Sequence, residues 1–392
     1  MSDRLEQISH LGAKAWLLAP EDPHPIDPVL RWTQVFESFV RSVGPSEPLP
    51  LQDIYSRLDG LFPDELCDAP VLVEHHDVLW IAGSGVLFDG QSGLAVPGSM
   101  LTRFPRHRQT PYAVSHWVEL TRPLSSFQRL QHALWLPHAD CQMFGHFMTE
   151  ILAFLWPIFT QEATQLTGWP VLLPGCDSTS SLSDWLFRLL RSCHLYPLLQ
   201  STLPKAVHLQ RVLIPQPSMR LHAGTSTTFL QSAQAFGDWL LCSSPVAEMT
   251  DHSRVFLSRS ALHEDCRKIE GERELEQYLK QSGWLIVHPE QEELPQQVAL
   301  IRAARCIAAF DGSALHGLAW LGDHAETMLI LLGDSPSLDY WLQFRAQKIR
   351  GWFLSCTQPF ADEKPSHLQN RQLTLQARDL SETIDALALV ET

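Results

Sequence analysis

Apolar runs alternate with helical periodicity along the second half of the chain, from about residue 206 to residue 350. Each short apolar run, typical of a buried strand, is followed by a stretch in which apolar residues recur every three or four positions. The regular part consists of predicted strands and helices at Val255–Ser258, Glu272–Gln281, Trp284–Val287, Leu294–Ala304, Cys306–Phe310, Ser313–Leu321 and Met328–Leu332. Strict alternation of strand and helix predicts a parallel sheet with helices on both faces, that is, a doubly wound domain of the nucleotide-binding type.

The first half of the chain has a more mixed pattern. Two amphipathic helices are predicted at about Val29–Val43 and Leu51–Leu61, followed by a β-rich section of short strands between Val71 and Phe88. Because 392 residues exceed one average domain, we expect two. The predicted organisation is an N-terminal domain over residues 1–205, a C-terminal domain over 206–350, and a final segment, 351–392, with a loop and one helix.

Composition narrows the class of protein. A hydrophobic content of 45% indicates a globular core, and the sequence lacks the run of ~18 apolar residues that a membrane helix needs. The net charge of -15 argues against nucleic acid as a general partner, because binding to a phosphate backbone needs a basic surface. The eight cysteines form no C-x-x-C pair, and Met1–Pro20 lacks the features of a secretory signal, so we expect a cytoplasmic location.

The segment Cys306–Trp320 is predicted to be a strand, a tight turn and a helix. The helix then begins at the carboxyl end of a strand, where an open α/β sheet binds its ligand. Free N–H groups favour an anion there, and Asp311, Gly312, Ser313 and His316 surround this point. We therefore expect a phosphate or diphosphate site. The alternative is an ordinary turn in which Asp311 or Ser313 caps the helix.

Two arginines follow the neighbouring strand. Arg259 comes directly after Val255–Ser258, and Arg267 lies in the loop that follows. Both can form charge-assisted bonds to a diphosphate at the turn of Gly312 and Ser313. The alternative is that they form surface salt bridges with the acidic residues of the same loop, Glu264, Asp265 and Glu270.

A histidine and a carboxylate share one face of a helix in the N-terminal half. His146 and Glu150 are four residues apart near the start of a helix predicted to run on to Phe159. Such a pair can take a proton from a hydroxyl, and Asp140 is a reserve candidate for this role. The alternative is an i,i+4 hydrogen bond that only stabilises the helix. A metal-dependent hydrolase using His138 with these three residues is a further alternative, although the spacing matches no known metal site.

Several motifs are absent from the sequence. It contains no G-x-G-x-x-G, no G-x-x-x-x-G-K-[ST] and no G-x-S-x-G, so dehydrogenases, P-loop kinases and serine hydrolases lose support. It also contains no Asp-x-Asp triplet, the usual clamp for a divalent metal on a nucleotide-sugar. A bound diphosphate must therefore be neutralised by arginines and a helix terminus, with neither a metal nor a cofactor.

These segments together resemble glycosyltransferase family 61. The motifs that carry the resemblance, over roughly residues 70 to 335, are Leu257-Ser258-Arg259, Arg267-Lys268-Ile269, Glu272–Leu275, Gln297–Ala304, Asp311–His316, and Gly145-His146-Phe147 with Glu150. The resemblance implies a GT-B architecture, with two Rossmann-like domains facing a cleft, in a soluble bacterial-type member. It also implies metal-independent, inverting transfer of a hexosyl or pentosyl group from a nucleoside-diphosphate sugar to a hydroxyl of a glycan or glycosylated acceptor, as in polysaccharide biosynthesis.

The resemblance also suggests roles for the candidate residues. Arg259, Arg267, Asp311, Gly312, Ser313 and His316 would bind the donor, and His146 or Glu150 would be the general base. The chain departs from the family pattern at Gly271, where the family often has Asn, and at Asp311, where it often has His. These departures leave open a second function, a catalytically silent relative that binds sugar nucleotide or glycan as a partner subunit.

Overall fold

The structure is a computed structural model, and the described residues group into two compact units. It describes residues 26–44, 47–61, 69–82, 86–91, 96, 98–99, 123–137, 143–173, 181–198, 203–221, 224–246, 254–263, 266–322, 326–360 and 370–390. Unit 1 contains residues 26 and 27 and the described residues between 69 and 221. Unit 2 contains those between 28 and 61 and those from 224 onward.

Unit 1 is built on a mixed sheet with the order β3-β2-β8-β5-β6-β7, to which β4 adds by pairing with β8. Its strands are β2 (Leu72–Ile81), β3 (Leu87–Asp89), β4 (Gln128–Leu130), β5 (Ala133–Trp135), β6 (Pro170–Leu172), β7 (Tyr196–Leu198) and β8 (Ala206–Pro215). The long strands β2 and β8 are antiparallel, whereas β4, β5, β6 and β7 run parallel to their neighbours. Strands β2 and β3 lie in the section between Val71 and Phe88 that was predicted to be β-rich, although β2 is one ten-residue strand rather than several short ones.

Helical segments follow the strands of unit 1. They are α5 (Phe144–His146), η6 (Phe147–Ile151), η7 (Leu152–Phe154), η8 (Trp156–Phe159), α6 (Ala163–Leu166) and α7 (Ser181–Ser192). The predicted helix that runs to Phe159 is therefore present but irregular. Pro157 has no N–H to donate to the carbonyl of Ala153, and that carbonyl instead accepts the N–H and the hydroxyl of Ser218, both at 2.8 Å.

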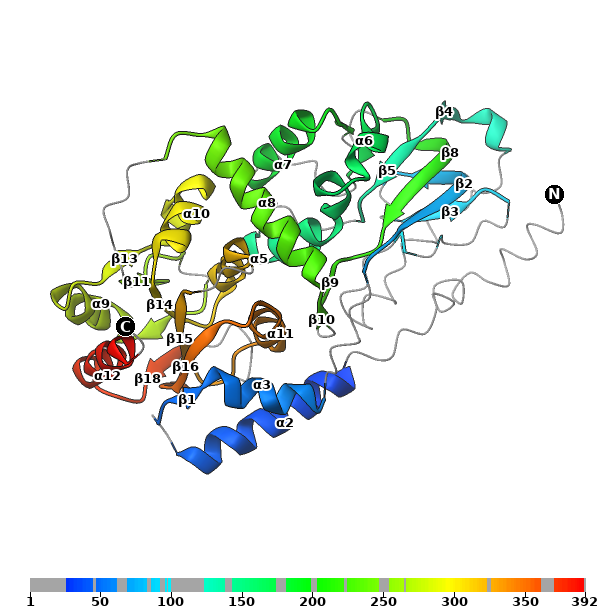
Figure 1. The fold of residues 1–392 in the computed structure, drawn as a ribbon. Helices are drawn as coiled ribbons and strands as arrows, with labels where there is room; N and C mark the ends of the chain where they lie inside the picture. Colours follow the sequence, from blue (N-terminus) through cyan, green and yellow to red (C-terminus); the bar gives the residue numbers. More distant parts are fainter. Residues whose placement is uncertain are drawn as a thin grey trace. The chain divides into compact units, whose positions relative to one another are not determined.

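Unit 2 contains the predicted parallel sheet, in the order β16-β15-β14-β11-β13 (Figure 1). Its strands are β11 (Arg254–Leu257), β13 (Leu285–Val287), β14 (Cys306–Phe310), β15 (Met328–Gly333) and β16 (Arg350–Ser355), and β1 (Leu49–Pro50) pairs antiparallel with β16. The connecting helices are α9 (Glu272–Gln281), α10 (Leu294–Ala303), the 3₁₀ helix η11 (Ser313–Leu321) and α11 (Leu338–Gln347), with a short η10 (Pro289–Gln291). Strand and helix bounds agree with the predicted ones to within two residues.

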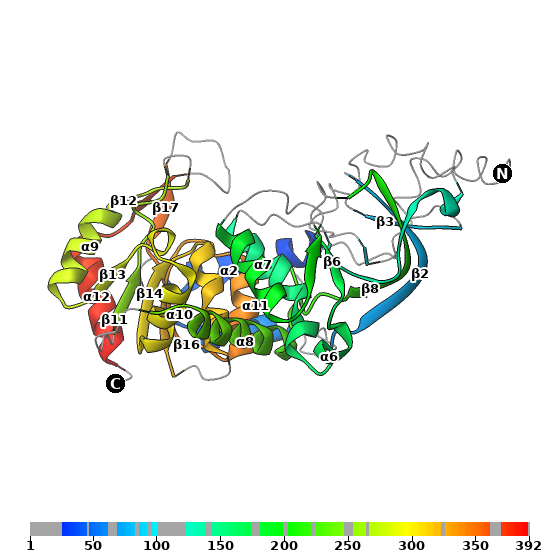
Figure 2. The same ribbon diagram turned by 90° about the horizontal axis from the view of Figure 1, so that it is seen from above.

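Apolar side chains cover both faces of this sheet. On one face, alternate strand residues such as Ala308 and Ile330 pack against α9 and α12 (Ala377–Leu389), which lie side by side in Figure 1. The intervening residues Ile307 and Leu329 are buried on the other face. The long helix α8 (Thr227–Ser243) packs along α10 and η11 (Figure 2).

The described residues between 28 and 61 belong to unit 2 although they precede the sheet of unit 1 in the sequence. Helices α2 (Ile26–Val43) and α3 (Leu51–Asp59) flank β1, and Phe36 lies 5.2 Å from Phe353 and 5.4 Å from Trp341, measured between ring centroids. Both helices were predicted, but no local pattern indicates that β1 pairs with β16.

The final segment contains more than the expected loop and helix, which corrects the description of residues 351–392. Strand β16 continues to Ser355, and it is followed by β17 (Thr357–Pro359) and β18 (Arg371–Leu373). Strand β18 is antiparallel to β17 and parallel to β12 (Ile269–Glu270). This small sheet extends beyond the carboxyl edge of the main sheet.

Candidate functional site

The reversal point of the parallel sheet lies between β11 and β14. From β11 the chain proceeds to β13 on one side, whereas β14, β15 and β16 follow on the other side. In open α/β sheets the ligand binds at the carboxyl edge of such a point. Arg259 follows the last residue of β11 by two positions, and Asp311 directly follows β14. The two residues on which the sequence prediction depended therefore lie where this topology expects a ligand.

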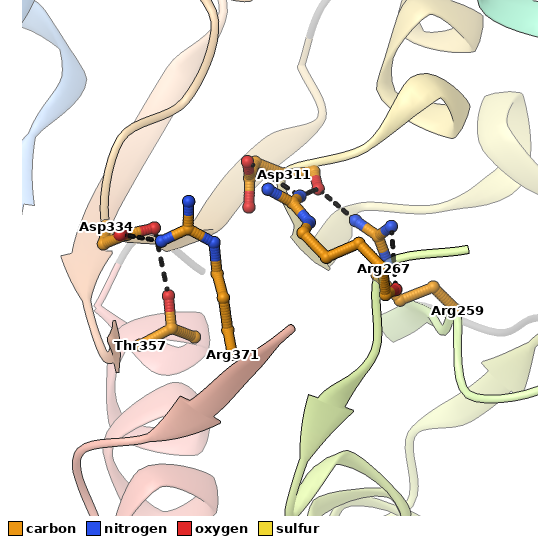
Figure 3. A network of polar contacts seen from close by, with 6 residues as sticks. All are labelled: Arg259, Arg267, Asp311, Asp334, Thr357 and Arg371. Atoms are coloured by element: carbon orange, nitrogen blue, oxygen red, sulfur yellow. Dashed lines mark hydrogen bonds and ion pairs between the residues drawn. The ribbon is translucent and has the colours of Figure 1, made fainter. Parts of the chain in front are cut away.

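Arg259 and Arg267 converge on Asp311 (Figure 3). Both guanidinium groups donate hydrogen bonds to the main-chain carbonyl of Asp311. Nη2 of Arg267 also forms an ion pair with Oδ2 of Asp311 at 2.9 Å, and Nη2 of Arg259 donates to the carbonyl of Arg267 at 3.3 Å. Of the acidic residues in the alternative interpretation, Glu264 and Asp265 lie outside the described residues, and Asp311 is the carboxylate that pairs with Arg267. The side chain of Asp311 is only 7% exposed, and it acts as their internal counter-ion rather than as a helix cap.

A third arginine lies beside this pair. Arg371 forms an ion pair with Asp334, which follows β15 directly, and Asp334 also accepts a hydrogen bond from the hydroxyl of Thr357 at 3.3 Å (Figure 3). The sequence analysis did not identify Arg371. It reaches the site through the pairing of β18 with β12, which no local pattern reveals.

The three guanidinium groups are crowded and largely buried. Burial lowers the pKa of Arg259, and the positive charge of Arg267 lowers it further. Burial likewise lowers the pKa of Arg371, with a further contribution from Arg267. In the network of Figure 3, three positive charges face the two negative ones of Asp311 and Asp334, and the carboxyl group of Glu272, whose pKa is raised to about 7, lies beside Arg259. This cluster is a local excess of positive charge at the ligand edge of the sheet.

Glu272 holds the loop of Arg259 in place. Its Oε1 accepts the backbone N–H of Arg259 at 2.8 Å and the hydroxyl of Ser258 at 3.1 Å. The carboxyl group is almost fully buried, and this burial raises its pKa to about 7, although the hydrogen bond from Arg259 opposes the shift. Gly271, just before it, has φ 92°, in the left-handed region that Gly and Asn tolerate best. A change from Asn to Gly at this position is therefore conformationally conservative.

The shifted pKa of Glu272 gives a prediction for stability. Between the ordinary pKa of 4.5 and about 7 the folded protein binds this proton more tightly than the unfolded chain. The free energy of unfolding therefore falls as the pH rises through this window, and the Glu272 contribution reaches about 3 kcal/mol. Glu272→Gln retains an oxygen acceptor but does not titrate. In this variant the free energy of unfolding, measured by urea unfolding at pH 4.5 to 8, should lack the part of the decrease that Glu272 causes. Glu274→Gln, exposed on the same helical turn, controls for the lost charge. An identical pH profile in wild type and Glu272→Gln would contradict the assignment.

The remaining predicted donor-binding residues lie in different surroundings. Gly312 is extended, with φ -179°, and a Cβ at this position would lie 3.0 Å from Nη1 of Arg259. Its lack of a side chain therefore makes room for the guanidinium group rather than permitting a sharp turn. Ser313 is exposed at the start of η11. His316 is buried, with Nδ1 3.1 Å from Oε1 of Gln343 and its ring centroid 4.7 Å from that of Tyr340. Its proposed role at the donor stays a prediction.

In unit 1, His146 and Glu150 contact each other as predicted. Nδ1 of His146 lies 3.2 Å from Oε1 of Glu150. The side chain of His146 is 34% exposed, whereas that of Glu150 is 1% exposed. Glu150 lies in a π-helical turn, η6, a distortion that is frequent at functional sites. The reserve candidate Asp140, like His138, lies outside the described residues.

Two searches of the described residues bear on the class of protein. No group of three or more His, Cys, Asp and Glu side chains within them is arranged to hold a metal ion. No helix within the same residues is both long enough and apolar enough to span a bilayer.

A protein-family model matches the central part of the chain. Residues 144–328, just under half of the chain, match the model of the family described as glycosyltransferase 61. The matched range includes His146, Glu150, Arg259, Arg267 and Asp311. This match supports the resemblance of the chain to glycosyltransferase family 61. It therefore also supports the class of transferases that act on a sugar donor and an acceptor. A search of curated proteins found no match.

Proposed function

We propose that the protein is an inverting glycosyltransferase that moves a sugar from a nucleoside-diphosphate donor to an acceptor hydroxyl without a metal ion on the diphosphate. The observation that carries the proposal is the pair Arg259 and Arg267, largely buried together at the reversal point of the parallel sheet. The proposed fold class is GT-B, with unit 2 as the donor domain and unit 1 as the acceptor domain. The acceptor is a carbohydrate or a glycosylated molecule.

The donor side of the proposal concerns the leaving group. When the bond between the sugar's anomeric carbon and the diphosphate breaks, negative charge increases on the phosphate oxygens. Arg267 uses Nη2 toward Asp311 and has further N–H groups for these oxygens. The first N–H groups of η11, from Ser313, add a fixed positive potential. Preorganised donors of this kind are the usual main source of rate.

The acceptor side assigns different roles to His146 and Glu150. Because Glu150 is almost fully buried, only the half-exposed His146 can contact an acceptor. Glu150 accepts a hydrogen bond from Nδ1–H of His146. Nε2 of His146 is then the ring nitrogen that accepts the proton from the acceptor hydroxyl. The acceptor oxygen then attacks the anomeric carbon from the side opposite the diphosphate, and the configuration inverts. The negative charge of Glu150 stabilises the resulting imidazolium.

The catalytically silent alternative has little structural support. The left-handed φ of Gly271 accounts for the first departure from the family pattern by conformation alone. Asp311 is neutralised by Arg267, so it does not present an uncompensated negative charge to a diphosphate.

Nucleoside diphosphates should raise the melting temperature of the protein equally with and without EDTA. Ligands that bind only the native state stabilise it by mass action, and arginines replace the metal in this proposal. Screening UDP, GDP, ADP and CDP also identifies the base. Gly312→Val should abolish the increase, because its side chain displaces the Arg259 guanidinium, while circular dichroism shows a folded protein. Stabilisation that disappears in EDTA would show that a metal ion takes part and would exclude the proposed mechanism.

A further inference from the structure

We propose that Arg371 is a third donor-binding residue, which binds one phosphate of the diphosphate and makes the site favour two phosphates over one. This inference rests on the proposed function and extends it to a residue that lies C-terminal to the family match. It assigns to strand β18 a part in the site that begins with Arg259 and Arg267.

Backbone pairing holds Arg371 next to the strand that follows Arg267. The N–H of Arg371 donates to the carbonyl of Lys268 at 2.9 Å, and the N–H of Lys268 donates to Oδ1 of Asn370 at 2.8 Å. Arg371 is opposite Ile269 in the parallel register of β12 and β18. The two arginines thus project from neighbouring segments whose relative position is fixed by hydrogen bonds.

The guanidinium group of Arg371 has unused donors. Its contact with Asp334 uses Nη1, although a carboxylate can take two parallel N–H bonds from an arginine. Nε of Arg371 has no hydrogen-bond partner in the described part of the chain. The same holds for Nε of Arg259 and Oδ1 of Asp311. Holding three positively charged guanidinium groups close together costs free energy. A salt bridge with a purely structural role does not require that cost.

The positions of the three arginines match an elongated anion. Figure 3 shows Arg371 and Arg259 on opposite sides of Asp311. Arg259 follows β11 and Arg371 is anchored to Asp334 after β15, so the cluster extends along three neighbouring strand ends, β11, β14 and β15. Two linked phosphates reach further along this row than one phosphate does. Arg371 therefore adds affinity for a diphosphate that a monophosphate does not gain.

The test measures binding of inorganic pyrophosphate, phosphate and matched nucleoside mono- and diphosphates by titration calorimetry. Arg371→Gln should weaken binding of pyrophosphate and of the best nucleoside diphosphate by about 10- to 100-fold, the factor for hydrogen bonds to a charged group. The ratio between diphosphate and monophosphate affinity should fall. Arg378→Gln, on the exposed surface of α12, is the matched control. It should change neither the diphosphate affinity nor the ratio of diphosphate to monophosphate affinity.

A second variant separates binding from folding. Arg371→Lys keeps a positive charge beside Asp334 but loses the planar guanidinium, so it should remain folded and still bind pyrophosphate more weakly than wild type. If Arg259→Gln weakens pyrophosphate binding and both Arg371 variants do not, the inference is wrong and the proposed function stands. If wild type binds neither pyrophosphate nor any nucleoside diphosphate, both are wrong.

Discussion

His146→Ala is expected to lower the turnover number roughly 10²- to 10⁴-fold while the affinity for the nucleoside diphosphate stays unchanged. The reason is that the half-exposed imidazole is the only member of the His146–Glu150 pair that an acceptor can contact. Its loss removes the group that takes the acceptor proton. Steady-state transfer assays combined with calorimetry of the donor nucleotide measure the two quantities separately.

Glu150→Gln should give a smaller decrease in turnover and a different pH dependence. The amide can still occupy the space beside Nδ1 of His146, but it does not stabilise the imidazolium. The acidic limb of the pH–rate profile should therefore shift toward lower pH, because the imidazolium form of His146 loses the nearby negative charge that stabilises it. Full activity in both His146→Ala and Glu150→Gln would show that the pair is structural and that the base is a different residue.

Arg267→Ala is expected to lower the free energy of unfolding by about 3–5 kcal/mol, because it leaves the Asp311 carboxylate buried without its ion-pair partner. The double variant Arg267→Ala/Asp311→Ala should recover much of this stability, since the unpaired charge is gone. Binding of nucleoside diphosphate should not recover, because the cation that binds it is still missing. Urea unfolding and calorimetry distinguish the two effects.

Arg378→Ala is the control for this pair of variants. Arg378 and Glu382 form an exposed ion pair, with side chains 71% and 64% exposed, and such pairs contribute little to the free energy of unfolding. If the double variant regained diphosphate affinity along with stability, Arg267 would have only a structural role, and the assignment of this residue to the donor would be wrong.

The parallel half of the fold was predictable because its signals are local. Buried parallel strands are short unbroken apolar runs, and amphipathic helices follow them with clear periodicity. The predicted bounds Glu272–Gln281 and Cys306–Phe310 are those of α9 and β14. The same reasoning located Arg259 and Asp311, since each follows a strand that the sequence itself identifies.

Features that depend on distant contacts were not predictable. Gly351 suggests the end of an element, but it lies within β16, where a Cβ would be 1.9 Å from the carbonyl oxygen of Leu329. Asp77 interrupts the apolar pattern of β2 with φ 52°, yet the strand continues, because its carboxylate lies 2.9 Å from Nε2 of His208 on β8. Arg371 belongs to a three-residue strand that pairs with β12 and β17, and β12 lies far from it in the sequence.

The discontinuity of unit 2 has a consequence for the order of events during synthesis. The larger part of unit 1, residues 67–221, is encoded between the two parts of unit 2, so the strands of unit 1 leave the ribosome before any parallel strand of unit 2 exists. Strand β1 and the aromatic side chains of α2 must then wait for β16 and Trp341. Long sequence separations of this kind slow folding, and they leave apolar surface exposed in the nascent chain. The aromatic side chains of Trp32 and Phe36 on α2 therefore lack Trp341 and Phe353 as packing partners until nearly all of the chain has been synthesised.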